Sequence, residues 1–282
     1  LGAGLLGVML VHQFWTALSS FRNSWLARYV FDRRYRCYPR ATWDSAVYSA
    51  VWPAAWRSGV GSAMSFGLIQ ISGIFHAQSR DLASVNSYLL GLRLVQAISQ
   101  FSQAPFYSKL PSLAKLYAAG DHATVVALAK RGMKFAYWSF VAPAAILAMS
   151  GALLLDTIGS AVPFPSTALW LILCSAILIE RYGAMHLQLY STTNHIVWHV
   201  ANGVTGVLMV LFWIAFYPKF GATGLAVGML AAYAAFFSWF GAVRAHRAFA
   251  LPFPRYDLMT AGGPLLLFLL ACAAAVALHG LR

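Results

Sequence analysis

The sequence predicts an all-α fold, a polytopic transmembrane helix bundle with about eight spans. Three observations lead to this class: the 282 residues are 60% hydrophobic, only 10% of them are charged, and the mean hydropathy is +0.67. A water-soluble domain carries about 25% charged residues. This chain therefore lacks the polar surface that a soluble globule needs, and its apolar residues fall in runs long enough to cross a bilayer.

Taken in order along the chain, the apolar runs number eight. A spanning helix needs about 20 mostly apolar residues, and runs of that kind cover roughly residues 1–18, 58–76, 84–107, 134–155, 167–189, 196–217, 221–243 and 258–279. The chain begins with Leu1, and we expect this position to lie within a longer protein.

The connections between these runs alternate between basic and nearly neutral segments. Most of the lysines and arginines lie in residues 19–57, 108–134 and 244–257, which together with 190–195 fall on one side. Because basic loops stay on the cytoplasmic side of a membrane, the alternation predicts a multi-pass protein with this side in the cytoplasm. The net charge of +13 is explained in the same way, so we expect no nucleic acid as a partner.

The third run carries a polar stripe. Arg93, Gln96, Gln100, Gln103 and Tyr107 are spaced 3, 4, 3 and 4, which places all five on one face of a helix. An arginine near the bilayer centre costs at least about 2.5 kcal/mol and must face protein or water. Hydrogen bonds to a neighbouring helix would explain a single glutamine, whereas five residues in register favour the wall of a water-filled cavity.

After this stripe the helical pattern continues as a basic amphipathic segment, residues 109–131. Asp121 follows a glycine and is an expected N-cap for a helix that ends at Lys130 and Arg131. A basic amphipathic helix of this kind lies on the anionic cytoplasmic leaflet.

Two charged residues fall inside the fifth run. Glu180 and Arg181 point about 100° apart on a helix, so they need not pair with each other, and Glu180 can be the counter-charge of Arg93 or of a further span. Arg181 and Gln188 are seven apart and share a face. A structural ion pair and a role in binding substrate or protons both remain open.

The sequence predicts no metal and no cofactor. His195 and His199 have the i, i+4 spacing of zinc ligands, but no third ligand is evident, and polar packing together with Asn202 explains them better. The three cysteines form no CxxC pair. No P-loop, HExxH or GxSxG motif is present, so we expect no catalytic residues and no enzyme.

Two segments resemble a known family. The run ISQFSQAPFYSKLPSLAKLYAAGDHATVVALAKRG, with the pattern P-x-L-A-x-L-x-A-x-G-D from Pro111 to Asp121, is similar to the span and cytoplasmic helix of polysaccharide flippases. These are the O-antigen and lipid-linked oligosaccharide translocases of the multidrug/oligosaccharidyl-lipid/polysaccharide exporter superfamily. Residues 187–233, with P-x-x-G-x-x-G before a glycine-rich span, carry the second match. The resemblance covers about residues 45–250.

The resemblance implies two pseudo-symmetric bundles that rock around a central cationic cavity in the bacterial inner membrane. Residues 1–57 would be the end of the first bundle and a basic linker, 58–250 the second bundle, and 251–282 an accessory C-terminal span. The partners implied are a polyprenyl-pyrophosphate-linked glycan, the bilayer and polysaccharide assembly proteins. Arg93 and Arg181 would hold the pyrophosphate, since arginine binds phosphate through its planar fork. Gln96, Gln100 and Gln103 would bind sugar hydroxyls, and Glu180 would serve as coupling residue or counter-charge.

Three alternatives remain beside a flippase. A cation-coupled multidrug exporter of the same superfamily would show more embedded carboxylates than Glu180. A membrane enzyme would need a cluster of His, Asp or Arg near an outer loop, and the outer loops hold little beyond Arg80, Asp81 and Asp156. A truncated remnant that no longer transports is the third, because most of the first bundle would be missing from this chain.

Overall fold

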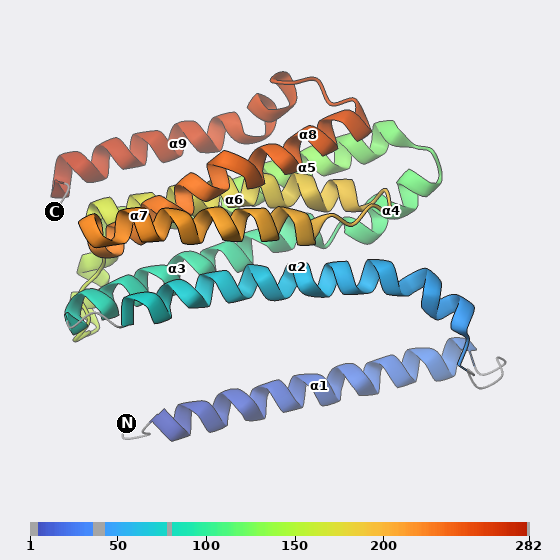
Figure 1. Ribbon diagram of the computed structural model, residues 1–282, viewed down its shortest axis with the longest axis horizontal. Coiled ribbons are helices and arrows are strands. Elements are labelled where there is room, and N and C mark those ends of the chain that lie inside the picture. The colour runs from blue at the N-terminus through green and yellow to red at the C-terminus, as the bar shows by residue number, and fades with distance from the viewer. Residues whose placement is uncertain (1–4, 36–42, 78–80, 281–282) are drawn as a thin grey trace. The chain divides into compact units, whose positions relative to one another are not determined.

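The computed structural model describes residues 5–35, 43–77 and 81–280, and all regular structure in these ranges is helical (Figure 1). The helices are α1 (Leu5–Tyr35), α2 (Ser45–Ala77), α3 (Leu82–Tyr107), α4 (Leu110–Ala118), α5 (His122–Thr157), α6 (Thr167–Ser191), α7 (Trp198–Ala232), α8 (Ser238–Phe249) and α9 (Arg255–His279), with a π-helical turn, Tyr233–Phe237, between α7 and α8. The prediction of an all-α chain is confirmed.

The chain divides into two compact units, Leu1–Val51 and Trp52–Arg282. The smaller unit contains α1, which continues to Tyr35 instead of stopping at the predicted run end near residue 18. No glycine or proline occurs between residues 8 and 35 to interrupt it. The larger unit contains most of α2, all the helices that follow it and the site described below.

Five described helical segments are long and apolar enough to cross a membrane: Ser45–His76, His122–Thr157, Thr167–Ser191, Trp198–Phe249 and Arg255–Leu278. The chain therefore has the character of a membrane protein. The predicted runs 1–18 and 84–107 are not among the five. The polar stripe of α3 lowers the hydropathy of that helix below what a lipid-facing span requires. The count of eight spans stays a prediction.

The helix that begins after Asp121 is longer than the sequence indicated. Asp121 caps α5 as predicted, since its Oδ1 accepts a hydrogen bond from the N–H of Thr124 at 3.0 Å. Hydrogen bonds from the side chain and backbone of Thr124 lower the pKa of this carboxyl. The expected end at Lys130 and Arg131 is wrong, because α5 runs without a break to Thr157. Gly132, directly after the basic residues, lets α5 pack closely against Phe106 of α3. This packing stabilises a helix that continues beyond Arg131.

The longest apolar segment folds back on itself. Within α7, Gly221 has φ 54° and ψ −132°, a conformation that interrupts the helix and that residues with a Cβ rarely adopt. The two arms on either side pack antiparallel: the indole N–H of Trp213 donates to the carbonyl of Leu225 at 3.0 Å. This break separates the apolar runs predicted as 196–217 and 221–243.

Helix α6 is the central element of the larger unit. In the most apolar part of α6, 61% of the residues are buried, against 20–33% in the other candidate spans. Figure 1 shows α6 (yellow) running between its neighbours, with α4 at the end where α6 stops and α7 starts. Because α6 is enclosed by protein, polar side chains on it must find partners within the bundle.

Candidate functional site

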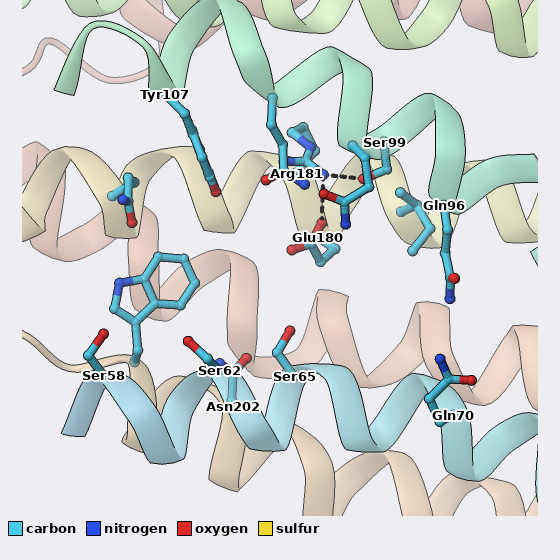
Figure 2. Close-up of a pocket in the computed structure, with 15 residues that line it drawn as sticks. Ser58, Ser62, Ser65, Gln70, Gln96, Ser99, Tyr107, Glu180, Arg181 and Asn202 are labelled. Atoms are coloured by element: carbon cyan, nitrogen blue, oxygen red, sulfur yellow. Dashed lines mark hydrogen bonds and ion pairs between the residues drawn. The ribbon is translucent and has the colours of Figure 1, made fainter. Parts of the chain in front are cut away.

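A polar cavity of about 330 Å³ lies among α2, α3, α6 and the start of α7 (Figure 2). Its described lining consists mainly of hydroxyl and amide side chains, with one arginine, one glutamate and one tryptophan. The lining residues are Ser58, Ser62, Ser65, Gln70, Gln96, Ser99, Gln100, Gln103, Tyr107, Ile177, Glu180, Arg181, Gln188, Trp198 and Asn202. A lining this polar is unusual inside a bundle of apolar helices.

Arg181 is the only cation among these lining residues, and it is almost completely buried, with 1% of its side chain exposed. Its Nη2 donates to the hydroxyl of Ser99 and lies 3.6 Å from the carboxylate of Glu180. With its amide oxygen turned toward the guanidinium, Gln103 accepts hydrogen bonds from Nη1 at 3.1 Å and Nη2 at 3.0 Å. The guanidinium is therefore held by one carboxylate, one hydroxyl and one amide.

This ion pair is one of the alternatives that the sequence left open. Neighbouring residues on a helix point in different directions, which suggested that Glu180 and Arg181 need not pair. The long arginine side chain overcomes this angular separation and reaches back to Glu180. Glu180 is thus a counter-charge, and the residue that it neutralises is Arg181.

The predicted stripe on α3 meets the cavity along most of its length. Gln96, Gln100, Gln103 and Tyr107 all line it, as their shared helical face requires. Arg93, which begins the stripe, is exposed and is not among the lining residues. The structure therefore brings Gln96, Gln100, Gln103, Glu180 and Arg181 together and leaves Arg93 outside the group.

The opposite wall comes from α2, and sequence reasoning did not assign it to the site. A row of small residues such as Ser58, Ser62 and Ser65 is also typical of close helix contact, but these serines project toward the cavity opposite Tyr107 and Arg181 in Figure 2. Their 4, 3 spacing matches the 4, 3 spacing in the α3 stripe. This shared spacing is the sequence pattern from which a second polar helix face could have been predicted. Gln70 extends this polar face of α2.

Side-chain hydrogen bonds connect the cavity walls to one another. The Asn202 amide of α7 donates to the carbonyl of Gly61 in α2 at 2.8 Å. The indole N–H of Trp198 donates to the hydroxyl of Ser191 at 3.2 Å, which fixes the ring beside the cavity. Gly61 allows the approach, since a Cβ there would lie 2.7 Å from the Cβ of Trp198. Asn202 thus makes the polar contact expected at the start of α7, whereas Nδ1 of His199 is buried without a hydrogen-bond partner among the residues that the structure describes.

The arrangement suits the binding of an uncharged, hydroxyl-rich group. Amides and hydroxyls both donate and accept hydrogen bonds, and an indole face can pack against the apolar side of a ring. The charges of Arg181 and Glu180 cancel, so the electrostatic field in the cavity comes largely from side-chain dipoles. Comparisons with protein-family models, curated proteins and solved structures found no match.

Proposed function

We propose that this chain binds the glycan part of a lipid-linked oligosaccharide or polysaccharide precursor and takes part in its movement across the membrane. The observation that carries the proposal is the cavity, whose walls present six amides and five hydroxyls within an otherwise apolar bundle. A glycan offers a dense set of hydroxyl donors and acceptors that such walls can match.

The size of the site agrees with partial enclosure of a larger molecule. A volume of about 330 Å³ is at the lower end of the roughly 300–1,000 Å³ of typical ligand pockets. It would hold a small part of a glycan at one time. The polyprenyl chain would remain in lipid, where burying it needs no pocket.

Arg181 is the residue that we propose to meet the pyrophosphate. The guanidinium of Arg181 is paired with the carboxylate of Glu180. A phosphate group that enters the cavity would compete with this carboxylate for the N–H donors of the guanidinium. Arg93 is exposed on α3, so in our proposal its contribution is secondary to that of Arg181.

The proposed orientation follows from the basic end of the larger unit. Lys109, Lys115, Lys130, Arg131 and Lys134 lie on or beside α4 and the start of α5. Basic segments beside spans remain in the cytoplasm. We propose a multi-pass protein of the bacterial inner membrane that works together with a second bundle by alternating access, binding its cargo without altering it.

Binding to the purified chain tests the proposal directly. The probes are polyprenyl pyrophosphate carrying a disaccharide and the same lipid without sugar. Exchanging Gln96 and Gln100 together for alanine should weaken binding of the sugar-bearing probe about tenfold, since each hydrogen bond contributes about 0.5–1.5 kcal/mol. Binding of the sugar-free lipid should stay unchanged. Gln13→Ala, on exposed α1 and outside the cavity, is the matched control.

Other outcomes would support other functions. Equal binding of both probes by the wild-type chain and the double variant would contradict glycan recognition by this cavity. Binding of an apolar cation that depends on Glu180 would instead favour the multidrug exporter. Binding of neither class would favour a remnant that does not transport.

A further inference from the structure

A second group of titratable side chains lies outside the cavity and joins three helices. His186 of α6, His246 of α8 and Asp257 of α9 converge so that their ligand atoms all lie within 4.8 Å of one another. The carboxylate oxygens of Asp257 are 3.4 Å from Nε2 of His186 and 3.0 Å from Nε2 of His246. The two imidazole rings are stacked, with centroids 5.5 Å apart.

Backbone carbonyls set the protonation of both histidines. Nδ1 of His186 lies 2.8 Å from the carbonyl oxygen of Tyr182, and Nδ1 of His246 lies 3.1 Å from that of Leu251. A carbonyl oxygen only accepts, so Nδ1 carries the proton in each ring. In the neutral imidazole the lone pair is then on Nε2. Both Nε2 atoms lie beside the carboxylate, so a proton or a metal ion among them would offset the repulsion between the lone pairs and the anion.

The contacts themselves do not satisfy these atoms. In the described part of the chain, neither Nε2 atom and neither carboxylate oxygen has a partner with strict hydrogen-bond geometry, although the His186 imidazole and the Tyr182 hydroxyl both lie close to the Asp257 carboxylate. A buried polar atom left unpaired destabilises the folded chain. An imidazolium is expected to aim its N–H at the carboxylate with an N···O distance of about 2.7–2.9 Å. Both observed N···O distances, 3.4 Å and 3.0 Å, are longer.

We propose that His186, His246 and Asp257 bind a divalent transition-metal ion of the zinc class. Zinc–nitrogen and zinc–oxygen distances of about 2.0–2.2 Å in a tetrahedron separate neighbouring ligand atoms by about 3.4 Å. Nε2 of His186 lies 3.4 Å from Oδ1 of Asp257 and Nε2 of His246 lies 3.0 Å from Oδ2, so each imidazole is near that separation from one of the two carboxylate oxygens. Two imidazoles and a single carboxylate favour zinc over Mg²⁺ or Ca²⁺, which prefer oxygen ligands.

The surroundings have the features of a ligand shell. The carbonyls of Tyr182 and Leu251 orient the two rings, which is the usual task of groups behind metal-bound histidines. The side chain of His186 is 1% exposed, while those of His246 and Asp257 keep 12% and 14%. A water molecule can therefore complete the coordination from the side of His246 and Asp257.

The ion would fasten the C-terminal helix to the bundle. Asp257 lies in the first turn of α9, His246 in the last turn of α8, and His186 on the central helix α6. A carboxylate in a first turn also suits the helix dipole, but the dipole does not explain two imidazoles directed at it. None of the three lines the polar cavity, so this inference does not depend on the proposed function.

Metal analysis of the purified chain tests the site. The protein is prepared with a tag that contains no histidine, treated with EDTA, desalted, and incubated with ZnCl₂ before a second desalting. We expect one zinc per chain by elemental analysis, and cobalt(II) should give the absorption bands of a tetrahedral site. His246→Ala and Asp257→Asn should each weaken zinc binding by at least about tenfold. His122→Ala, an exposed histidine outside the cluster, should bind as the wild type does.

Thermal unfolding covers the case in which a cluster variant fails to fold. Zinc should raise the Tm of the EDTA-treated wild-type chain, and the same concentration of magnesium should not. A wild-type chain that retains no zinc and whose Tm is unchanged would overturn the proposal and show a proton-bridged ion-pair cluster. Full zinc binding by Asp257→Asn and His246→Ala would overturn it as well, because the ion would then lie elsewhere.

Discussion

Arg181 is the residue around which the polar cavity is organised. Its guanidinium is buried on the central helix and contacts Glu180, Ser99 and Gln103. Burying an ion pair costs desolvation that its own attraction barely repays, so such a pair seldom adds much stability. Removing one partner is different, because it leaves the other charge uncompensated.

We therefore expect Arg181→Met to lower the free energy of unfolding. Breaking a buried ion pair costs about 3–5 kcal/mol, and the loss here should be near the lower limit, because 19% of the Glu180 side chain is exposed and can be solvated. Adding Glu180→Gln to this variant should restore most of the loss. Equilibrium unfolding in detergent measures both. Arg93→Met, the same change at an exposed arginine, should stay within about 0.5 kcal/mol of the wild type. If Arg181→Met and Arg93→Met changed the free energy of unfolding equally, the expected cost of leaving Glu180 without its partner would be contradicted.

At the scale of elements, glycines set how closely α6 and α8 pack. A Cβ on Gly183 would lie 2.9 Å from the carbonyl oxygen of Phe237 and 2.9 Å from the Cα of Ser238. A Cβ on Gly241 would lie 2.6 Å from the carbonyl oxygen of Gly183. Close backbone approach at small residues is the usual way in which membrane helices associate. It also brings His246 on α8 toward His186 on α6.

Gly183→Ala should lower the stability of the chain by about 1–3 kcal/mol, because the added methyl meets backbone atoms that cannot turn aside. Gly262→Ala in α9 is the matched control, since a Cβ there meets nothing within 4 Å. That control should be neutral or stabilising by up to about 1 kcal/mol. Thermal unfolding of both variants measures the difference. A Gly183 variant as stable as the Gly262 variant would mean that the helices can separate without cost.

At the scale of the whole molecule, the charge distribution predicts how the larger unit is oriented. Basic residues gather around α4 and the start of α5, at the end where α6 stops and α7 starts (Figure 1). The first arm of α7 leads from this end to Gly221, a length of about 34 Å at 1.5 Å per residue. That length is sufficient to cross the roughly 30 Å hydrocarbon core of a bilayer.

Cysteine labelling tests this orientation. After Cys37, Cys174 and Cys272 are replaced by serine, a cysteine at Ala119 should react with a membrane-impermeant maleimide only from the cytoplasmic side. A cysteine at Lys219 should react only from the opposite side, because basic loops are retained in the cytoplasm. Ala119 and Lys219 are both exposed, so access to the reagent is comparable. Labelling of both positions from the same side would contradict a crossing by the first arm of α7.

The amino-acid sequence by itself determined the helical, apolar character of the chain, the cap at Asp121 and the polar face of α3. These properties depend on composition and on the 3.6-residue period, which are local. The Glu180–Arg181 pair was not predictable, because its formation depends on the reach of a long side chain after burial. The spacing of the α2 serines is recognisable in the sequence, but the sequence does not show that they face the polar residues of α3 and α6 across a cavity.

Only the tertiary structure decided which polar residues meet. His186, His246 and Asp257 are separated by 60 and 11 positions in the chain, and no spacing rule connects residues on three different helices. Asp257 lies in the first turn of a helix that was expected to be an accessory C-terminal span. It becomes a cluster member because α9 starts beside the end of α8 and the C-terminal part of α6. Local periodicity specifies the face on which a side chain lies, whereas helix packing specifies which other face it meets.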